Sequence, residues 1–366
     1  MSRRLIELPS TLLRIEGFRS SILNNERDLR LYLPPGYSEN PDSRYPVLYA
    51  HDGQNLFDKG AHETDPLNPF AVARSWNLHL TADRLIAEGL MEEVIIVGIF
   101  NMGGERSGEY MHGLEGIEHE RDRDQAVPRG ELYERFLVEE LKPFIDSVFR
   151  TKRDAENTGL IGSSRGGQIT YHIGFSRPDI FGKLGILSPY FYYVNPLTLI
   201  EYRMYVSFPS RLPLSKIWID LGGREGVLVM EKHVRQVVAE LLDAGYEPDS
   251  QLAFYFEPDA AHTEADWEER AHLPLLHLFG KPSKLAGVSL KELGTSFFER
   301  SKLRLLPTAE YENGWRITPL NGSFKSADPD AASVDHSGGI VPKEGGTAVV
   351  EYEFEGKRAK ASVTIS

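Results

Sequence analysis

The sequence predicts an α/β protein with a mostly parallel sheet covered by helices on both faces, followed by a small all-β sandwich. Up to about residue 280, short apolar runs bounded by Gly, Pro or Asp alternate with longer amphipathic segments, which is typical of strand–helix–strand units. After Gly280, short β-like runs are separated by turn dipeptides such as Asn313-Gly314. A length of 366 residues also suits about two domains.

The strands and helices of the first part follow from these patterns. We expect strands at the short, often β-branched runs Arg27–Leu33, Tyr45–Ala50, Glu93–Ile99, Asn157–Ile161, Gly182–Leu187, Lys216–Leu221 and Leu252–Phe256. We expect helices at the amphipathic stretches Thr81–Gly89, Arg129–Phe149, Gly167–Phe175 and Glu231–Ala244. The charged stretch Asn101–Arg129 is expected to lack regular structure, and a binding loop or lid and a solvated excursion are both open for it.

The second part predicts an antiparallel sandwich. Its expected strands are Leu303–Leu306, Trp315–Pro319, Ala332–Val334, Thr347–Phe354 and Arg358–Ile365. The only helix considered there is a short one at Ser289–Leu293. We therefore divide the chain into a domain of residues 1–280, a linker of residues 281–288 and a sandwich of residues 289–366.

Charge and composition exclude several classes of protein. The chain has 54 acidic and 41 basic residues and a formal net charge of −13, which disfavours a nucleic acid as partner. Cysteine is absent, so disulfide scaffolds and thiolate chemistry are excluded. The sequence contains no run of 18 apolar residues, so no membrane-spanning helix is expected. The N-terminus reaches Glu7, Pro9 and Arg14 without a secretory apolar stretch, so we expect a cytoplasmic protein.

The stretch Gly162-x-Ser164-x-Gly166 carries the strongest chemical signal. It lies between a predicted strand and a predicted helix, which is the context of a nucleophile elbow, where the serine occupies a strained turn between small neighbours. This context predicts that Ser164 is a nucleophile, whereas the pattern alone would also suit a flexible loop.

A serine nucleophile needs a base and a group that orients the base. In enzymes with such an elbow, an acid and then a histidine follow the serine. The histidines after Ser164 are His172, His233, His262, His272, His277 and His336. His262 is the best placed, because its loop directly follows the strand Leu252–Phe256, at the edge where open α/β sheets bind ligands.

Two carboxylates are candidates for the acid. Glu225 follows the carboxyl end of the strand Lys216–Leu221, from where its side chain can reach over the sheet. Asp220 lies inside that strand and is the second choice. For Glu225, a surface pair with Arg224 remains the alternative reading.

A tetrahedral intermediate needs two backbone N–H donors for its oxyanion. One donor is expected from Arg165, the residue after the nucleophile. The other is expected from Gln54, because the Gly53 turn after the strand Tyr45–Ala50 permits close approach.

With these residues in place, residues 20–280 resemble an esterase family of α/β-hydrolases that includes enterochelin-esterase-like proteins, feruloyl and acetylxylan esterases and, more remotely, mycolyltransferases. The resemblance is carried, in order, by segments 31–37, 44–49, 52–58, 136–146, 162–167, 178–182 and 188–190 and by the His262 loop. It implies a serine carboxylic-ester hydrolase that needs no cofactor. It also implies Ser164 as nucleophile, His262 as base, Glu225 as acid and the Gln54 and Arg165 amides as oxyanion donors.

One departure concerns the residue after the nucleophile, where the family often has methionine and this chain has Arg165. A guanidinium there suggests an anionic or strongly polar group on the substrate, unless the side chain points away. The C-terminal segments 326–335, 338–342 and 345–350 resemble a bacterial Ig-like domain. This second resemblance leaves the domain's role open among polysaccharide binding, extension of the protein and packing on a neighbour.

Further residues are candidates for binding the substrate, a small-molecule or carbohydrate-linked ester: Asp52, Asn55, Trp76, Tyr190 and Tyr192. For the aromatic ones, packing in the core is the competing account. The polar residues His51, Asp52, Asp58, His62, Glu63 and Asp65 lack a recognised ligand spacing, so no metal site is expected.

The sequence thus predicts a serine esterase. An inactive or weak hydrolase fold that binds carbohydrate or a partner through its Ig-like domain is the alternative from another class, and acyl transfer is a third. The acyl and alcohol groups of the substrate and homo-oligomerisation are left open by the sequence.

Overall fold

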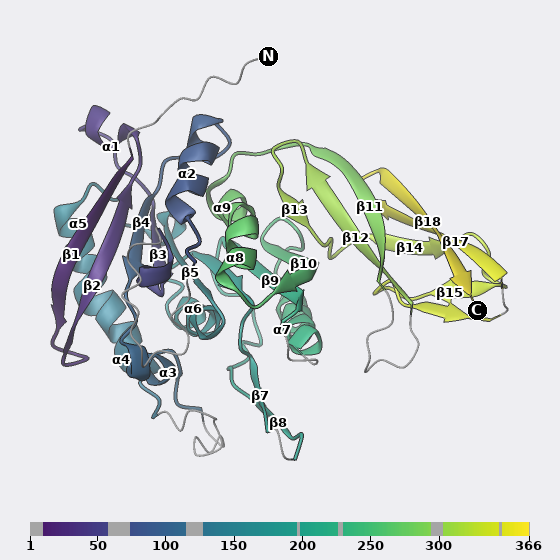
Figure 1. Ribbon diagram of the computed structural model, residues 1–366, viewed down its shortest axis with the longest axis horizontal. Coiled ribbons are helices and arrows are strands. Elements are labelled where there is room, and N and C mark those ends of the chain that lie inside the picture. Colours follow the sequence, from purple (N-terminus) through teal and green to yellow (C-terminus); the bar gives the residue numbers. More distant parts are fainter. Residues whose placement is uncertain are drawn as a thin grey trace.

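A computed structural model describes residues 10–57, 74–114, 127–195, 198–225, 230–293, 303–343 and 346–365 (Figure 1). Its centre is an eight-stranded sheet in the order β1-β2-β4-β3-β5-β6-β9-β10. β1 and β2 are antiparallel to their neighbours, and the remaining strands run parallel. The strands are β1 Thr11–Ser20, β2 Asn25–Leu33, β3 Val47–His51, β4 Ile95–Ile99, β5 Thr158–Ser163, β6 Lys183–Leu187, β9 Lys216–Arg224 and β10 Leu252–Ala261.

Helices cover both faces of this sheet, because successive strand residues point to opposite faces and both sets are apolar. In β3, Tyr49 packs in one core cluster and Leu48 in the other. α4 Gly130–Arg135, the π-helical turn η5 Phe136–Leu141, α5 Lys142–Val148, α6 Arg165–Ser176 and α7 Met230–Asp243 cover the first face. α2 Leu78–Ala87, α8 Glu264–Arg270 and α9 His272–Phe279 cover the second.

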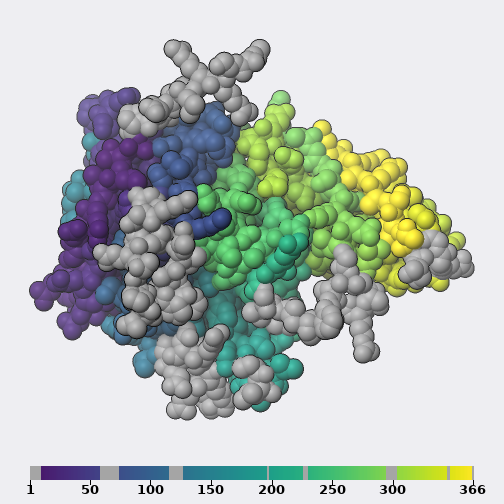
Figure 2. Space-filling model, viewed as in Figure 1, coloured from purple at the N-terminus to yellow at the C-terminus, as the bar shows by residue number. Residues whose placement is uncertain are grey.

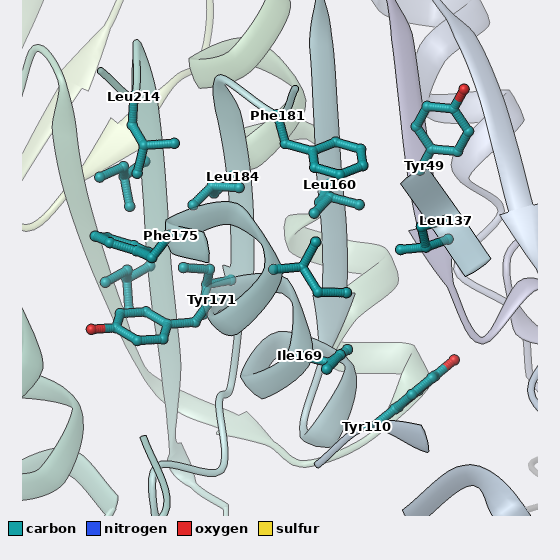
Figure 3. Packing of buried hydrophobic residues seen from close by; sticks show 14 of the residues in the cluster. Tyr49, Tyr110, Leu137, Leu160, Ile169, Tyr171, Phe175, Phe181, Leu184 and Leu214 are labelled. Atoms are coloured by element: carbon teal, nitrogen blue, oxygen red, sulfur yellow. The ribbon is translucent and has the colours of Figure 1, made fainter. Parts of the chain in front are cut away.

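The helix after the predicted nucleophile is buried along its length. Arg165 to Phe175 of α6 are all buried. Figure 3 shows Tyr171 and Phe175 of this helix facing the side chains of Leu184 and Leu214. A helix packed on all sides in this way holds its first turn, and the serine before it, in a fixed place on the sheet.

Differences from the expected elements concern the first edge strand of the sheet and several short elements. β1 was not expected, and it forms the sheet edge by pairing with β2. Part of the stretch Asn101–Arg129, expected to be irregular, is helical: η3 spans Gly103–Glu105 and α3 spans Arg106–Glu109. Further short elements are α1 Gly36–Glu39, η1 Gly53–Asn55, η6 Ala155–Asn157, β7 Tyr192–Val194 and β8 Glu201–Arg203.

The chain after Gly280 forms small antiparallel sheets, β11-β12-β13 and β14-β17-β18, with a β15-β16 pair. Their strands are β11 Leu285–Leu293, β12 Arg304–Tyr311, β13 Arg316–Ile317, β14 Ser323–Ser326, β15 Ala332–Val334, β16 Ile340–Pro342, β17 Gly346–Phe354 and β18 Lys357–Ile365. We call β11 to β18 the C-terminal β-module. Its own core contains Leu305, Ala332, Ile340, Ala348, Val350 and Val363.

Two expectations for this region were wrong. Ser289–Leu293 is not a helix but half of β11, because each of its residues pairs with a residue of β12, from Ser289 opposite Thr308 to Leu293 opposite Arg304. For the same reason the linker does not extend to residue 288: β11 begins at Leu285, so only residues 281–284 connect the sheets.

The C-terminal β-module covers the free edge of β10. The Thr318 N–H donates to the Phe254 carbonyl at 2.8 Å, and the Phe256 N–H donates to the Thr318 hydroxyl at 3.1 Å. Trp315 stacks on His277 of α9, with ring centroids 5.5 Å apart. In Figure 2 the light-green residues of the module lie directly against the green residues of the part that contains the eight-stranded sheet. An otherwise unpaired strand edge is thereby protected.

Candidate active site

Ser164 lies at a strained turn between β5 and α6. Its backbone has φ 57° and ψ −124°, outside the regions that L residues ordinarily occupy. The turn is tight enough that a Cβ on Gly162 would lie 2.6 Å from the backbone of Gly166. The two glycines of the motif therefore permit the close approach that projects the serine from the carboxyl end of β5, as the motif predicts.

The loop after β3 carries the second predicted oxyanion donor. Asp52 takes a left-handed conformation with φ 56°, and the turn Gly53–Asn55 follows it. A Cβ on Gly53 would lie 2.5 Å from the carbonyl carbon of Gly98 in β4, so only glycine fits there. The side-chain oxygen of Gln54 accepts the Asn101 N–H at 3.1 Å, which ties the loop to the residues after β4.

Asp52 holds this loop through an ion pair that sequence reasoning missed. Its carboxylate accepts from Arg106 Nε at 2.7 Å and Nη2 at 2.8 Å, and from Asn101 Nδ2 at 2.6 Å. Burial alone would raise the pKa of Asp52, but the charge and hydrogen bonds of Arg106 outweigh it and the pKa lies below its ordinary value. Asp52, a predicted substrate-binding residue, is therefore ionised and occupied by Arg106.

His262 and Glu225 meet at the carboxyl ends of β10 and β9. The Nδ1 atom of His262 lies 2.9 Å from Glu225 Oε2, and the Glu225 side chain is only 1% exposed. Glu225 Oε1 accepts the Ser188 hydroxyl at 2.5 Å and the Gly222 N–H at 2.6 Å. An imidazole that donates from Nδ1 to a carboxylate leaves Nε2 free to accept a proton.

The other predicted acid, Asp220, is occupied differently. It is fully buried and accepts from Trp218 Nε1 at 2.9 Å and from Arg270 Nε at 3.1 Å. Of the two carboxylates that the sequence left open, Glu225 is the one that bonds His262.

Residues beside the His262 loop complete this wall of the site. Trp267 of α8 packs edge-on against the His262 ring, with centroids 4.9 Å apart. Glu264 lies two residues after His262 and accepts Asn55 Nδ2 at 3.4 Å. Burial, with a further contribution from the charge of Asp52, raises the pKa of Glu264. Asn55, a predicted binding residue at the end of the turn Gly53–Asn55, therefore connects this turn to the Glu264 carboxyl.

The predicted aromatic binding residues separate in the structure. Tyr190 lies beneath the guanidinium of Arg165, 5.1 Å from its ring centroid, and packs with an apolar group of Met111, Tyr193 and Met204. The Tyr190 N–H lies 3.4 Å from the Ser164 carbonyl, so this group borders the elbow.

Trp76 and Tyr192 have other surroundings. Trp76 is 3% exposed and packs on Trp267, with ring centroids 5.8 Å apart, so it belongs to the core. Tyr192 stacks on His233 of α7 at 4.1 Å. For these two residues the competing account, packing, describes their contacts.

Most of the other candidate histidines are held by packing. His172 lies in α6 and bonds the Met204 carbonyl at 3.0 Å, and burial lowers its pKa to about 3. His277 bonds the Gln251 carbonyl, and burial lowers its pKa to about 3 as well. Burial lowers the pKa of His272 to about 4. His336 belongs to the C-terminal β-module.

Within the described ranges, no group of three or more His, Cys, Asp or Glu side chains is arranged to hold a metal ion. Asp58, His62, Glu63 and Asp65 lie outside those ranges. In the same part of the chain, no helix is both long and apolar enough to cross a membrane.

Fold and site together define a class of protein. A mostly parallel sheet with a strand–serine–helix elbow at its carboxyl edge, next to a hydrogen-bonded histidine and glutamate, is the arrangement of an α/β-hydrolase. The family model described as "Putative esterase" matches residues 20–275, and the chain belongs to that family.

Two relatives are similar to this chain in sequence. The chain is 31% identical over 178 residues to an endo-1,4-beta-xylanase/feruloyl esterase of Xylanibacter ruminicola, a match covering 47% of this chain and 20% of that protein. The chain thus spans about a fifth of that relative. It is 25% identical over 274 residues to the uncharacterized protein YbbA of Bacillus subtilis, covering 73% of this chain and 98% of that one.

Solved structures share the fold. A ferulic acid esterase from Anaeromyces mucronatus, solved with ferulic acid, is similar with a TM-score of 0.53 and 19% identity, over 76% of this chain and 94% of that one. An IroE-like serine hydrolase from Shewanella oneidensis is similar with a TM-score of 0.52 and 21% identity, over 74% and 80% of the two chains.

Proposed function

We propose that the protein hydrolyses carboxylic esters through an acyl-enzyme on Ser164, with His262 as general base and Glu225 as the acid that orients it. The observation that carries this proposal is the 2.9 Å contact between His262 Nδ1 and Glu225 at the same sheet edge as the strained Ser164 turn. Because Nδ1 donates to Glu225, Nε2 is left to take the serine proton.

The proposed reaction proceeds in two halves. Ser164 Oγ attacks the ester carbonyl while His262 Nε2 takes its proton, and the oxyanion is bound by the backbone N–H groups of Gln54 and Arg165. His262 then gives the proton to the leaving alcohol, and the acyl group remains on Ser164. Water attacks this acyl-enzyme with His262 again as base, which releases the acid and restores the serine.

The oxyanion donors are supported by local geometry. Arg165 is the first residue of α6, so its N–H belongs to the positive end of a twelve-residue helix. Gln54 lies in a turn fixed by the close approach of Gly53 to β4 and by the Asp52–Arg106 pair. Each such donor is worth about 10²- to 10³-fold in kcat.

For the substrate, we propose an aromatic acid esterified to a carbohydrate. The names of a relative and of a solved structure, a feruloyl and a ferulic acid esterase, support this class. So does Tyr190, a partly buried aromatic residue beside the elbow that packs on the buried Met111 and Met204 and can present its ring to a flat acyl group. We also propose that the C-terminal β-module is an Ig-like domain and that residues 281–284 link it to the rest of the chain.

The test compares Ser164→Ala with Ser163→Ala, its buried neighbour at the end of β5. Hydrolysis of methyl ferulate and of p-nitrophenyl esters from acetate to octanoate is measured, together with labelling by a fluorophosphonate and mapping of the labelled peptide. We expect Ser164→Ala to lose labelling and at least 10³-fold in kcat, and Ser163→Ala to keep both. Equal activity of the wild type and Ser164→Ala would refute the proposal.

A further inference from the structure

Behind Glu225 lies a buried charged cluster that has no part in the proposed reaction. Arg270 of α8 extends its guanidinium between two carboxylates: Nε lies 3.1 Å from Asp220 Oδ1, and Nη2 lies 3.5 Å from Glu225 Oε1. The side chains of Asp220, Glu225 and Arg270 are 0%, 1% and 3% exposed. Three charged groups are therefore removed from water directly beneath His262.

Ser188 joins the members of this cluster. Its hydroxyl donates to Glu225 at 2.5 Å and accepts from Arg270 Nη2 at 2.8 Å and from Trp267 Nε1 at 3.0 Å. Ser188 itself has a positive φ of 44°, a conformation that is strained for a residue other than glycine. The strain indicates that the surrounding contacts hold this hydroxyl in place.

Orientation of His262 requires a single carboxylate, so the second one needs an explanation. Burial raises the pKa of Asp220, and the charge of Glu225 adds to this effect, while Arg270 and the Trp218 indole oppose it. Buried charges are costly unless they are paired. Burial thus disfavours the charged form of Asp220, and Arg270 is the main group that stabilises it.

We propose that Asp220 and Arg270 are positioning residues that together set how readily His262 accepts a proton. Arg270 lies between the two carboxylates, and Asp220 takes up part of the Arg270 charge so that Glu225 still presents a net negative charge to His262. The inference rests on the proposed role of His262 as the base.

The charges of the cluster determine whether each substitution should make His262 easier or harder to protonate. With Asp220 and Glu225 ionised, the cluster carries a net charge of −1, which the imidazolium neutralises when His262 takes the serine proton. If Asp220 becomes neutral, Arg270 balances Glu225 and the imidazolium is less stabilised. If Arg270 becomes neutral, two carboxylates remain and the imidazolium is more stabilised.

Other charged groups lie around the His262 loop on different elements. Glu264 lies at the start of α8, and the Asp52–Arg106 pair approaches from the oxyanion loop. Arg224 and Asp259 pair at the exposed ends of β9 and β10. These groups remain in every variant considered below, so their effects are common to all the curves compared.

The experiment measures the rate of fluorophosphonate labelling of Ser164 against pH. We expect the pH of half-maximal rate to fall by about one unit in Asp220→Asn and to rise by about one unit in Arg270→Met, as one buried charge at this range implies. Arg270→Lys, which keeps the charge, and the double variant Asp220→Asn/Arg270→Met should both stay near the wild type. Folding of each variant is checked by urea unfolding.

Opposite shifts from the two single variants would support the proposal, because a merely structural role lowers both rates without moving the curves apart. Shifts in the same direction, or no shift in either, would overturn it. If Arg270→Met does not fold, the pH curves of Asp220→Asn and Arg270→Lys are compared instead. A half-maximal pH that is lower in Asp220→Asn only supports the proposal, and coincident curves overturn it. Absence of wild-type labelling at Ser164 would instead refute the proposed function.

Discussion

Replacing Arg106 with methionine tests whether the Asp52–Arg106 pair holds the loop of residues 52–55, which carries the proposed oxyanion donor Gln54. Both Arg106 nitrogens bond the Asp52 carboxylate, at 2.7 and 2.8 Å, and the two side chains are 20% and 11% exposed. Breaking a buried pair by removing one partner costs about 3–5 kcal/mol, and the partial exposure places this pair at the lower end, about 3 kcal/mol. Because the Gln54 amide lies two residues away in the same loop, kcat should fall by about 10- to 100-fold.

The pH dependence of this loss has a definite sign. In the wild type the pKa of Asp52 lies below its ordinary value, so the pair stabilises the fold at neutral pH and this stabilisation is lost only as the pH falls below about 4. Without Arg106, burial raises the pKa of Asp52, and its ionisation then destabilises the fold as the pH rises. The difference in unfolding free energy between wild type and variant should therefore be larger at pH 7.5 than at pH 5.0.

Urea unfolding at the two pH values and kcat on p-nitrophenyl acetate provide the assay. The double variant Asp52→Asn/Arg106→Met is the control, since it removes both charges and should recover much of the stability but not kcat. A stability difference that is equal at the two pH values, or a variant with wild-type kcat, would refute the reasoning that this pair is buried, charged and responsible for the loop.

Three further predictions follow from single contacts. Gly53→Ala should lower the unfolding free energy by about 1–3 kcal/mol and reduce kcat, because the added Cβ would lie 2.5 Å from backbone atoms. The control is Gly104→Ala, whose Cβ would have nothing within 4 Å, and it should match the wild type in both urea unfolding and kcat. Burial raises the pKa of Asp249 to about 6, so its ionisation weakens the fold as the pH rises from about 4 to about 6. In urea, Asp249→Asn should be more stable than the wild type by about 3 kcal/mol at pH 8, and most of this advantage should be gone at pH 4. An advantage that does not depend on pH would contradict this. Thr318→Val should lower the unfolding free energy by about 1–2 kcal/mol, because it leaves the Phe256 N–H without its acceptor. A calorimetric unfolding midpoint equal to that of the wild type would show that this bond does not hold the C-terminal β-module on β10.

Local signals in the sequence predicted most of the sheet and the elbow. Strands such as β5 and β10 are short apolar runs whose residues are buried on both faces, so their composition alone identifies them. The Ser164 turn depends on its immediate glycine neighbours, which is why a five-residue motif predicts its strained backbone.

Segments whose structure depends on a distant partner were predicted less well. Ser289–Leu293 carries a weak helical pattern, yet it is a strand because β12 supplies its hydrogen bonds. Arg106 lies in a stretch that was expected to be irregular, and nothing in its neighbours indicates that it reaches Asp52.

By itself, the sequence determined the class of fold, the nucleophile turn, and a short set of candidates for the base and the acid. The tertiary structure decided which carboxylate meets His262: Glu225 lies just beyond the end of β9 and can reach it, whereas Asp220, inside the strand, is held by Arg270. It also brought Arg106 to Asp52 and Arg270 to Glu225 across 54 and 45 residues. The physical reason is that a turn is specified by neighbouring residues, whereas the charges that surround a buried side chain come from elements that only packing brings together.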